Sequence, residues 1–230
     1  MFNFKKTKEP HQSGPLSRDE MISHFVRKYR VINEEFLKGF ELTAKHPKSV
    51  TFFGSARFGE GSEWYEKCRS LSNKISKETG YTIVSGGGPG IMEAVNRGAI
   101  EAGGTTIGYG IKLPHEQTFN KYVSDFRNFN YFFVRKVLMN YSAEAYIICP
   151  GGFGTMDEFF GILTLIQTKK IPRVPIILFC KKYWDESLTP LFDYFIKEGA
   201  ISQEDMDFFV TTDDMDKIVQ IIKKAPFRKE

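Results

Sequence analysis

The sequence contains few of the features that mark a secreted protein, a membrane-spanning protein or a protein stabilised by a structural metal. Its 230 residues include only three cysteines, Cys68, Cys149 and Cys180, which lie far apart and form no C-x-x-C pair. This usage is typical of a reducing compartment and excludes both a disulfide framework and a zinc site of the usual spacing. The chain lacks an apolar run of the ~20 residues that span a bilayer, and its first ten residues lack the apolar core of a signal peptide. We therefore expect a soluble, cytoplasmic protein with no membrane partner.

The sequence also has no large excess of charge of one sign. The 32 Lys and Arg residues against 28 Asp and Glu give a formal net charge of +4, which suits a small anionic ligand. No basic run is dense enough to track a nucleic-acid backbone, so we expect no nucleic-acid partner. The histidines show no metal-ligand spacing, and no metal is predicted; they are His11, His24, His46 and His115.

Changes of pattern along the chain predict three regions. Residues 1–16 are polar, with two prolines and a glycine, and are expected to form a flexible tail. Residues 17–46 are expected to form one amphipathic helix, because Ser17 and Glu20 have capping-box spacing and apolar residues recur every three or four positions. Residues 47–230 are expected to form the main domain. The apolar stripe of the helix needs burial against this domain or another subunit.

From residue 49 onward, short apolar runs alternate with helical patterns. Strands are predicted at 50–53, 81–84, 105–107, 145–149 and 174–179, with a weaker one at 208–210. Helices are predicted at 62–79, 90–102, 130–142, 155–168, 183–198 and 213–224. Apolar strands separated by helices are typical of a parallel sheet covered on both faces. Right-handed crossovers then give an α/β fold, a doubly wound parallel sheet in a Rossmann-like three-layer sandwich, with the N-terminal helix added.

Three glycine-rich turns follow predicted strands at one edge of this sheet. They are Gly-Ser-Ala-Arg at 54–57, Ser-Gly-Gly-Gly-Pro-Gly at 85–90 and Pro-Gly-Gly-Phe-Gly-Thr at 150–155. Glycine lets the backbone approach a ligand closely, and the N–H groups that open the following helix favour phosphate. One such turn is also compatible with an ordinary strand-to-helix connection. Three turns at one edge indicate a phosphate-bearing ligand; Ser55, Gly87 and Gly88 are candidate contacts from the first two.

Motifs for larger phosphate ligands and for common hydrolases are missing. No turn has the form G-x-G-x-x-G followed by a suitable acidic residue, so a dinucleotide cofactor is not indicated. The P-loop motif G-x-x-x-x-G-K-[ST] is absent, as are H-E-x-x-H and G-x-S-x-G. A smaller phosphate compound remains, and no cofactor is predicted.

Two side chains are candidates for chemistry beside the third turn. Thr155 and Glu158 have the spacing of a capping box, which is the purely structural interpretation. Glu158 would also lie one turn inside a helix that opens on the ligand, where a carboxylate needs a function or a cation beside it. Arg135 is the candidate cation, because it lies in the segment 131–139, which is apolar nearly all round and should be buried on most faces. The alternative is that Arg135, and more so Lys136, extends to the surface or to a subunit contact.

These motifs together resemble the Lonely Guy family of cytokinin riboside 5′-monophosphate phosphoribohydrolases, whose members are often labelled lysine decarboxylases. The resemblance covers about residues 49–225, and the N-terminal helix is similar to that of the longer bacterial subclass. It rests on Gly54-Ser55-Ala56-Arg57, Gly86-Gly87-Gly88-Pro89-Gly90-Ile91-Met92, Arg135-Lys136 and Pro150-Gly151-Gly152-Phe153-Gly154-Thr155-Met156-Asp157-Glu158. No residue pattern supports a pyridoxal-phosphate decarboxylase.

The resemblance implies hydrolysis of the N-glycosidic bond of a nucleoside 5′-monophosphate, such as a cytokinin riboside 5′-monophosphate or AMP, to free base and ribose 5-phosphate. The family's catalytic arginine and glutamate fall on Arg135 and Glu158. A substrate-binding glutamate falls on Glu116, and Lys136, which follows the arginine, is a further candidate for binding the substrate or its phosphate. The resemblance also implies a homodimer, or an assembly of dimers, with active sites near the subunit contact. The residues it places around the phosphate are Gly151, Gly152, Gly154 and Thr155.

Two other functions remain open from the sequence. The first is a non-catalytic carrier or sensor of a phosphorylated ligand, because molybdenum-cofactor carrier proteins resemble this fold and share a similar glycine turn. The presence of both Arg135 and Glu158 argues against it. The second is a broad purine or pyrimidine nucleotide nucleosidase, which the sequence does not separate from a cytokinin-specific enzyme.

Overall fold

The computed structural model describes residues 15, 17–112 and 119–226. The predicted tail therefore lies almost entirely outside the described residues, and so does Glu116. The elements in chain order are α1 (Arg18–Ala44), β1 (Ser49–Phe53), α2 (Glu63–Thr79), β2 (Thr82–Ser85), α3 (Ile91–Glu101), β3 (Thr106–Ile111), β4 (Asp125–Phe129), α4 (Phe132–Tyr141), β5 (Ala145–Ile148), α5 (Phe153–Gln167), β6 (Ile176–Leu178), α6 (Lys181–Ser187), α7 (Thr189–Lys197), a 3-10 turn (Gln203–Phe208), β7 (Val210–Thr211) and α8 (Met215–Lys224).

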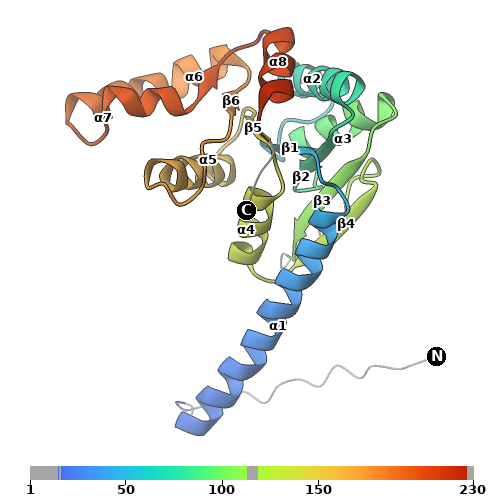
Figure 1. The fold of residues 1–230 in the computed structure, drawn as a ribbon, viewed down its shortest axis with the longest axis vertical. Helices are drawn as coiled ribbons and strands as arrows, with labels where there is room; N and C mark the ends of the chain where they lie inside the picture. The colour runs from blue at the N-terminus through green and yellow to red at the C-terminus, as the bar shows by residue number, and fades with distance from the viewer. Residues whose placement is uncertain (1–14, 16, 113–118, 227–230) are drawn as a thin grey trace.

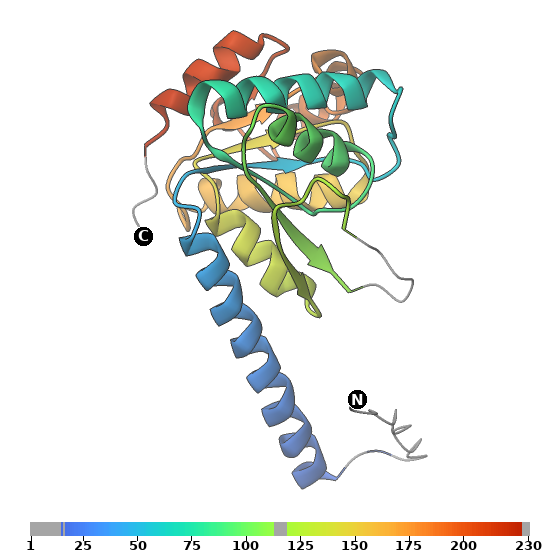
Figure 2. The same ribbon diagram turned by 90° about the vertical axis from the view of Figure 1, so that its right-hand side faces the viewer.

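The strands form one all-parallel sheet in the order β4-β3-β2-β1-β5-β6-β7. The predicted Rossmann-like α/β fold is thereby confirmed. Helices α2, α3 and α8 pack on one face of the sheet, and α1, α4, α5, α6 and α7 lie on the other (Figures 1 and 2). Because β1 pairs with β2 on one side and β5 on the other, the direction of winding reverses between β1 and β5. Ligands of such sheets bind at this switch point, beyond the carboxyl ends of the strands.

Two predictions of secondary structure were wrong. The strand β4 was missed, because an edge strand with alternating half-exposed side chains lacks a continuous apolar run. The single helix predicted at 183–198 is two helices, α6 and α7, which meet at Leu188. Pro190 lies in the first turn of α7, where a missing N–H is tolerated, whereas it would break the ladder inside a continuous helix.

The predicted N-terminal helix is present as α1, and its capping box is formed, since Ser17 and Glu20 exchange hydrogen bonds. Only its second half contacts the domain, through the buried residues Glu35, Gly39 and Leu42. The first half extends away from the body of the molecule (Figure 2). In the described part of the chain, no helix is long and apolar enough to cross a membrane.

Helix α1 approaches α4 closely at Gly39. A Cβ atom at this position would lie 2.1 Å from Cδ1 of Leu138, which is fully buried. We expect Gly39→Val to lower the free energy of unfolding by about 1–3 kcal/mol through overpacking, since Val and Gly differ little in helix propensity. Denaturant unfolding of Gly39→Val, Leu138→Ala and the double variant would measure this. The double variant should be more stable than the sum of the single effects predicts, and strict additivity would contradict the contact.

The aromatic face of α4 is an exception to the burial predicted for most faces of this helix. Phe132, Phe133 and Tyr141 are 61%, 49% and 53% exposed, while Val134 and Leu138 are buried. One face of α4 packs on the sheet, and its aromatic face points outward beside α1. This face is an exposed aromatic surface.

Candidate active site

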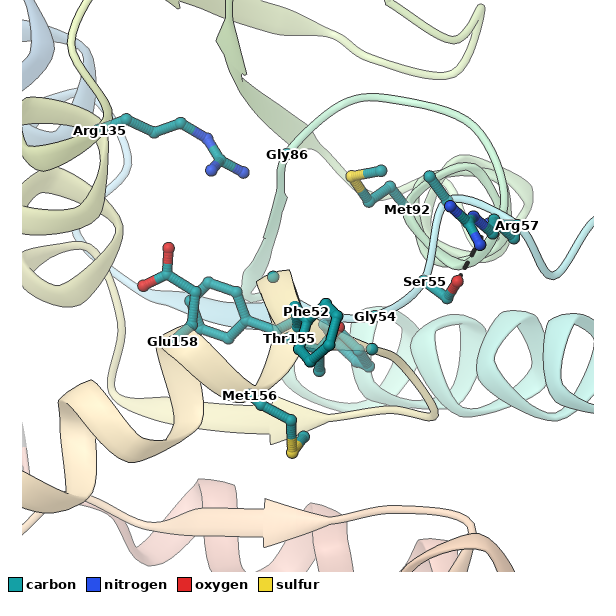
Figure 3. A pocket seen from close by; sticks show the side chains of 15 residues that line it. Phe52, Gly54, Ser55, Arg57, Gly86, Met92, Arg135, Thr155, Met156 and Glu158 are labelled. Atoms are coloured by element: carbon teal, nitrogen blue, oxygen red, sulfur yellow. Dashed lines mark hydrogen bonds between the residues drawn. The ribbon is translucent and has the colours of Figure 1, made fainter. Parts of the chain in front are cut away.

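A cavity of about 690 Å³ opens at the switch point of the sheet, a size typical of small-molecule sites. Its walls come from the turns after β1, β2 and β5 and from helices α3, α4 and α5 (Figure 3). The three glycine-rich turns that the sequence singled out thus meet around one cavity. The residues that line it are Phe52, Phe53, Gly54, Ser55, Ala56, Arg57, Gly86, Met92, Arg135, Gly152, Phe153, Gly154, Thr155, Met156 and Glu158.

Backbone hydrogen bonds join the three turns, with Ser55 as the central residue. The Ser55 N–H donates to the Pro150 carbonyl of the third turn at 3.0 Å. The Ser55 carbonyl accepts from the N–H of Ile91, which follows the second turn, at 2.9 Å. The three turns are therefore joined in one frame by backbone hydrogen bonds.

Two glycines of this frame are required by close approach. Gly90 has a φ of +69°, and a Cβ there would lie 2.5 Å from the Ser55 carbonyl oxygen. A Cβ on Gly151 would lie 2.0 Å from Oγ1 of Thr155 and 3.1 Å from the backbone nitrogen of Ser55. Glycine at these positions lets neighbouring backbones touch, which explains their presence without reference to a ligand.

The second turn contacts the cavity through Gly86, whereas Gly87 and Gly88 lie beside it. The Gly87 N–H donates to Oγ of Ser85 at 3.0 Å. Asn120 fastens the turn from outside, donating from Nδ2 to the carbonyls of Gly87 and Gly88 at 3.0 and 2.9 Å. Sequence reasoning missed Asn120, because it belongs to none of the motifs in the sequence.

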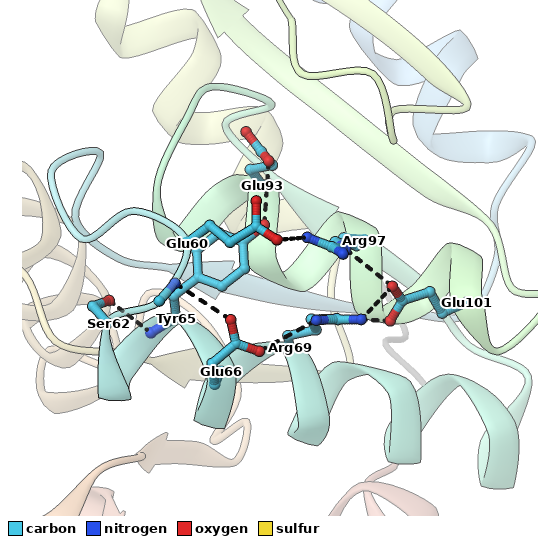
Figure 4. Close-up of polar contacts among 9 residues, drawn as sticks. Glu60, Ser62, Tyr65, Glu66, Arg69, Glu93, Arg97 and Glu101 are labelled. Carbon is cyan, nitrogen blue, oxygen red and sulfur yellow. Dashed lines mark hydrogen bonds and ion pairs between the residues drawn. The ribbon is translucent and has the colours of Figure 1, made fainter.

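Charged residues of α2 and α3 anchor the loop that follows the first turn (Figure 4). Glu60 of this loop pairs with Nη1 of Arg97 at 2.5 Å. Arg97 and Arg69 both pair with Glu101, at 3.0 and 2.6 Å. A connected network holds its members more firmly than isolated surface pairs do. The loop is thereby tied to α3, the helix that begins at the second turn.

Helix α5 opens on the cavity. Its N-cap is Gly152, and it has no side-chain cap. Thr155 is the third residue of the helix and is buried, so the capping-box interpretation of Thr155 and Glu158 is wrong. The first N–H groups of a helix lack intrahelical partners and, with the helix dipole, favour an anion. The lining residues Gly152, Gly154 and Thr155 place this helix terminus at the cavity wall.

Glu158 lies in the cavity wall about 9 Å along the α5 axis from Gly152, at the usual rise per residue, and is only 5% exposed. Nζ of Lys136 is 3.0 Å from its Oε2 and 2.9 Å from Oδ2 of Asp157. Lys136 also donates to the Asp157 carbonyl at 3.0 Å. Among the described residues, Oε2 of Glu158 has no partner of hydrogen-bonding geometry. The carboxylate is thus held by charge, and Glu158 is part of the cavity lining.

Arg135 reaches the same cavity from α4. Its Nε donates to the Tyr109 carbonyl of β3 at 2.7 Å, which directs the guanidinium into the cavity rather than to the surface (Figure 3). Burial lowers the pKa of Arg135 from its ordinary value, and the charges of Glu158 and Asp157 oppose that change. No ion pair joins Arg135 to Glu158, although both are described residues, so the cation that contacts the glutamate is Lys136.

Several lining residues belong to the motifs in the sequence but were given no individual role there. Arg57 belongs to the first turn and adds a second positive side chain to the wall. Met92 and Met156 add apolar surface, and Phe153 is 97% exposed at the mouth. In the described residues, no group of His, Cys, Asp and Glu is placed to hold a metal ion.

The fold and the site define an α/β protein of the Rossmann-like type, with a ligand cavity at its switch point and a helix terminus suited to an anion. The sequence profile of a family described as "Possible lysine decarboxylase" matches residues 92–222. The chain belongs to this family, the Lonely Guy family.

Relatives of known function are distant but cover most of the chain. The cytokinin riboside 5′-monophosphate phosphoribohydrolase of Rhodococcoides fascians is 24% identical over 182 residues, which are 77% of this chain and 90% of that protein. The cytokinin riboside 5′-monophosphate phosphoribohydrolase LOG of Oryza sativa subsp. japonica is 28% identical over 168 residues, 71% of this chain and 67% of that protein.

Solved structures with the same fold include molybdenum cofactor proteins. The molybdenum cofactor binding protein of Rippkaea orientalis has a TM-score of 0.56 at 19% identity, over 76% of this chain and 96% of that one. The molybdenum cofactor carrier protein of Chlamydomonas reinhardtii has a TM-score of 0.53 at 20% identity, over 77% and 98%. At these identities the likeness shows the fold alone.

Proposed function

We propose that the protein hydrolyses the N-glycosidic bond of a nucleoside 5′-monophosphate, either a cytokinin riboside 5′-monophosphate or AMP, releasing free base and ribose 5-phosphate. The observation that carries the proposal is the buried Glu158 carboxylate, which shares one cavity with the open N-terminus of α5. A phosphate at Gly152 and Gly154 would place the sugar along the helix toward Glu158. The phosphoribohydrolase relatives support the same reaction.

Cleavage of an N-glycoside passes through a state with positive charge at the anomeric carbon, as in glycoside hydrolysis. Glu158 stabilises that charge and accepts a proton from the attacking water. The water oxygen bonds to the anomeric carbon as the carbon–nitrogen bond breaks, its electron pair leaves with the base, and a proton ends on the base. Lys136 pairs with Glu158 and orients its carboxylate, which is a positioning role. Atoms and electrons of this hydrolysis balance without a metal or cofactor.

Arg135 and the turns hold the substrate during this step. The Arg135 guanidinium, fixed by its bond to the Tyr109 carbonyl, faces the sugar and base region of the cavity. The N–H groups of Gly152, Gly154 and Thr155 bind the phosphate. Phosphate binding far from the reacting carbon then contributes to orientation at that carbon. The predicted contacts of Gly87, Gly88 and Glu116 stay predictions; the two glycines would act through Gly86, which lines the cavity.

A panel of nucleotides with chromatographic identification of products tests the proposal. AMP, N6-isopentenyladenosine 5′-monophosphate, and pyrimidine nucleotides are incubated with the protein, with the matching nucleosides as controls. Release of base and ribose 5-phosphate from nucleotides but not nucleosides is expected. The spread of rates separates a cytokinin-specific enzyme from a broad nucleosidase. Absence of base from every nucleotide, with a tightly bound pterin in the purified protein, would instead establish a carrier.

The protein is also proposed to form a homodimer through the face made by α1 and α4. Phe36 of α1 contacts Phe133, and Phe40 contacts Tyr141, with ring centroids 6.4 and 6.1 Å apart. Exposed apolar side chains continue along α1, at Met21, Ile22, Phe25, Val26, Tyr29 and Leu37. A continuous apolar surface across two helices is typical of an interface between subunits. Since α4 also carries Arg135, the second copy would lie close to the active site.

We expect the double substitution Phe132→Ser and Phe133→Ser to shift the protein from dimer to monomer, because both side chains lie on the proposed interface and are exposed in a single chain. Light scattering after size-exclusion chromatography gives the mass directly. Ile100→Ser on the opposite face of the sheet, 38% exposed, is the matched control and should leave the dimer intact. A wild-type monomer, or a double variant that stays dimeric, would contradict this interface.

A further inference from the structure

Tyr183 of α6 contacts the third glycine-rich turn, residues 150–155, and does not line the cavity. The Tyr183 hydroxyl donates a hydrogen bond to the carbonyl of Gly151 at 2.9 Å, across 32 residues of sequence. Tyr183 is half-buried and does not line the cavity. It therefore touches the turn only on the side that faces away from a ligand.

This contact fixes the direction of the Gly151–Gly152 peptide. A trans peptide is planar, so its carbonyl and the following N–H point in opposite directions. Because Tyr183 holds the Gly151 carbonyl on the outer side, the N–H of Gly152 is directed to the opposite, cavity side. Within the described residues this N–H has no hydrogen-bond partner. Two adjacent glycines would otherwise allow the peptide plane to rotate with little steric cost.

The tyrosine is itself firmly held. Its ring packs edge-on against Trp64, Trp184 and Phe58, with centroids 5.9, 4.9 and 6.4 Å away. Trp184 is fully buried and donates from Nε1 to the Phe179 carbonyl at 2.7 Å, which anchors α6 to the end of β6. Phe58 directly follows the first glycine turn. The aromatic cluster thus connects the outer sides of the first and third turns.

We propose that Tyr183 is a positioning residue for the phosphate group of the ligand, holding the Gly152 N–H in its binding orientation. This inference rests on the proposed function, because it takes the phosphate of a nucleotide to bind at the α5 terminus. Tyr183 does not touch the reacting atoms and is not a catalytic residue. Its loss should weaken recognition of phosphate while leaving recognition of the sugar and base unchanged.

The test compares Tyr183→Phe with the wild type, using ligands with and without phosphate. We expect KM for AMP and Kd for ribose 5-phosphate to rise by about 3- to 10-fold, the effect of one lost hydrogen bond. The kcat at saturating AMP should change less than twofold, and the inhibition constant of adenosine should not change. A merely structural defect would weaken adenosine and AMP alike. Tyr146→Phe is the matched control, since it removes a buried tyrosine hydroxyl that donates to the Asn140 carbonyl, away from the cavity.

The possible results separate the two proposals. Unchanged affinity of Tyr183→Phe for ribose 5-phosphate, or equal losses for adenosine and AMP, would overturn the positioning role. The positioning role would also be overturned if Tyr146→Phe lost affinity for phosphate-bearing ligands, and not for adenosine, to the same extent as Tyr183→Phe. If the wild type binds ribose 5-phosphate but hydrolyses no nucleotide, the proposed reaction fails, and the binding measurements still decide the role of Tyr183. If the wild type binds no phosphate compound, both proposals fail.

Discussion

Replacement of Glu158 by glutamine is expected to lower kcat for nucleotide hydrolysis by about 10²–10⁴-fold and to leave nucleotide affinity within a few-fold of the wild type. Glutamine has the same shape but carries no charge, so it neither stabilises a cation at the anomeric carbon nor accepts a proton from water. Single-turnover hydrolysis gives the chemical rate, and calorimetric titration with AMP gives the affinity. The carboxylate is buried, which makes its charge effective at short range.

The neighbouring carboxylate supplies the control. Asp157 also pairs with Lys136, at 2.9 Å, but its side chain is 67% exposed and does not line the cavity. Asp157→Asn should therefore cost far less activity than Glu158→Gln. Wild-type turnover in Glu158→Gln, or equal losses in both variants, would show that the chemistry does not depend on the buried carboxylate.

Substitution of Gly90 by alanine is expected to destabilise the protein by about 2–5 kcal/mol and to abolish high-affinity nucleotide binding. The positive φ of Gly90 is strained for alanine, and the added Cβ would approach the Ser55 carbonyl oxygen to 2.5 Å and Ala56 C to 2.6 Å. These are backbone atoms, which do not move aside as a flexible side chain does. The hydrogen bonds that join Ser55 to the second and third turns would be displaced.

Gly103 is a second glycine with a positive φ, at which alanine adds backbone strain without a close contact. It has a φ of +74°, like Gly90, but no atom lies within 4 Å of a Cβ built there. Gly103→Ala should cost about 1–2 kcal/mol and leave nucleotide affinity unchanged. Thermal unfolding and AMP titration of both variants measure the two effects. If both variants lost equal stability and equal affinity for AMP, the close approach of Gly90 to Ser55 would not be what holds the three turns together.

The sequence indicated most of the fold because the central strands are continuous apolar runs with helices between them. Such runs occur only where a strand is covered on both faces, as β1, β2 and β5 are. The edge strand β4 has no such cover, so four of its five side chains are polar or exposed and it shows no continuous apolar run. The break between α6 and α7 was predictable in principle from Pro190, but the apolar periodicity continues across it.

The site was only partly predictable, for a different reason. Glycine turns are local signals, so the approximate place of the cavity that they line follows from the chain itself. The partner of Glu158 depends on how α4 packs beside α5, and the sequence pointed to Arg135, whereas the ion pair is made by Lys136. Tyr183 has no sequence signal, because its contact with Gly151 exists only after α6 has folded back behind the third turn.

Hydrolysis of AMP in ¹⁸O-enriched water tests the central claim most directly, with the products separated and weighed by mass spectrometry. Attack of water on the anomeric carbon predicts one ¹⁸O atom in ribose 5-phosphate that is reduced with borohydride as it forms, before its aldehyde form exchanges oxygen with the water, together with unlabelled adenine and no inorganic phosphate. Appearance of adenosine and labelled inorganic phosphate would show a phosphatase. Adenine release without label in the ribose product would contradict attack by water at the anomeric carbon.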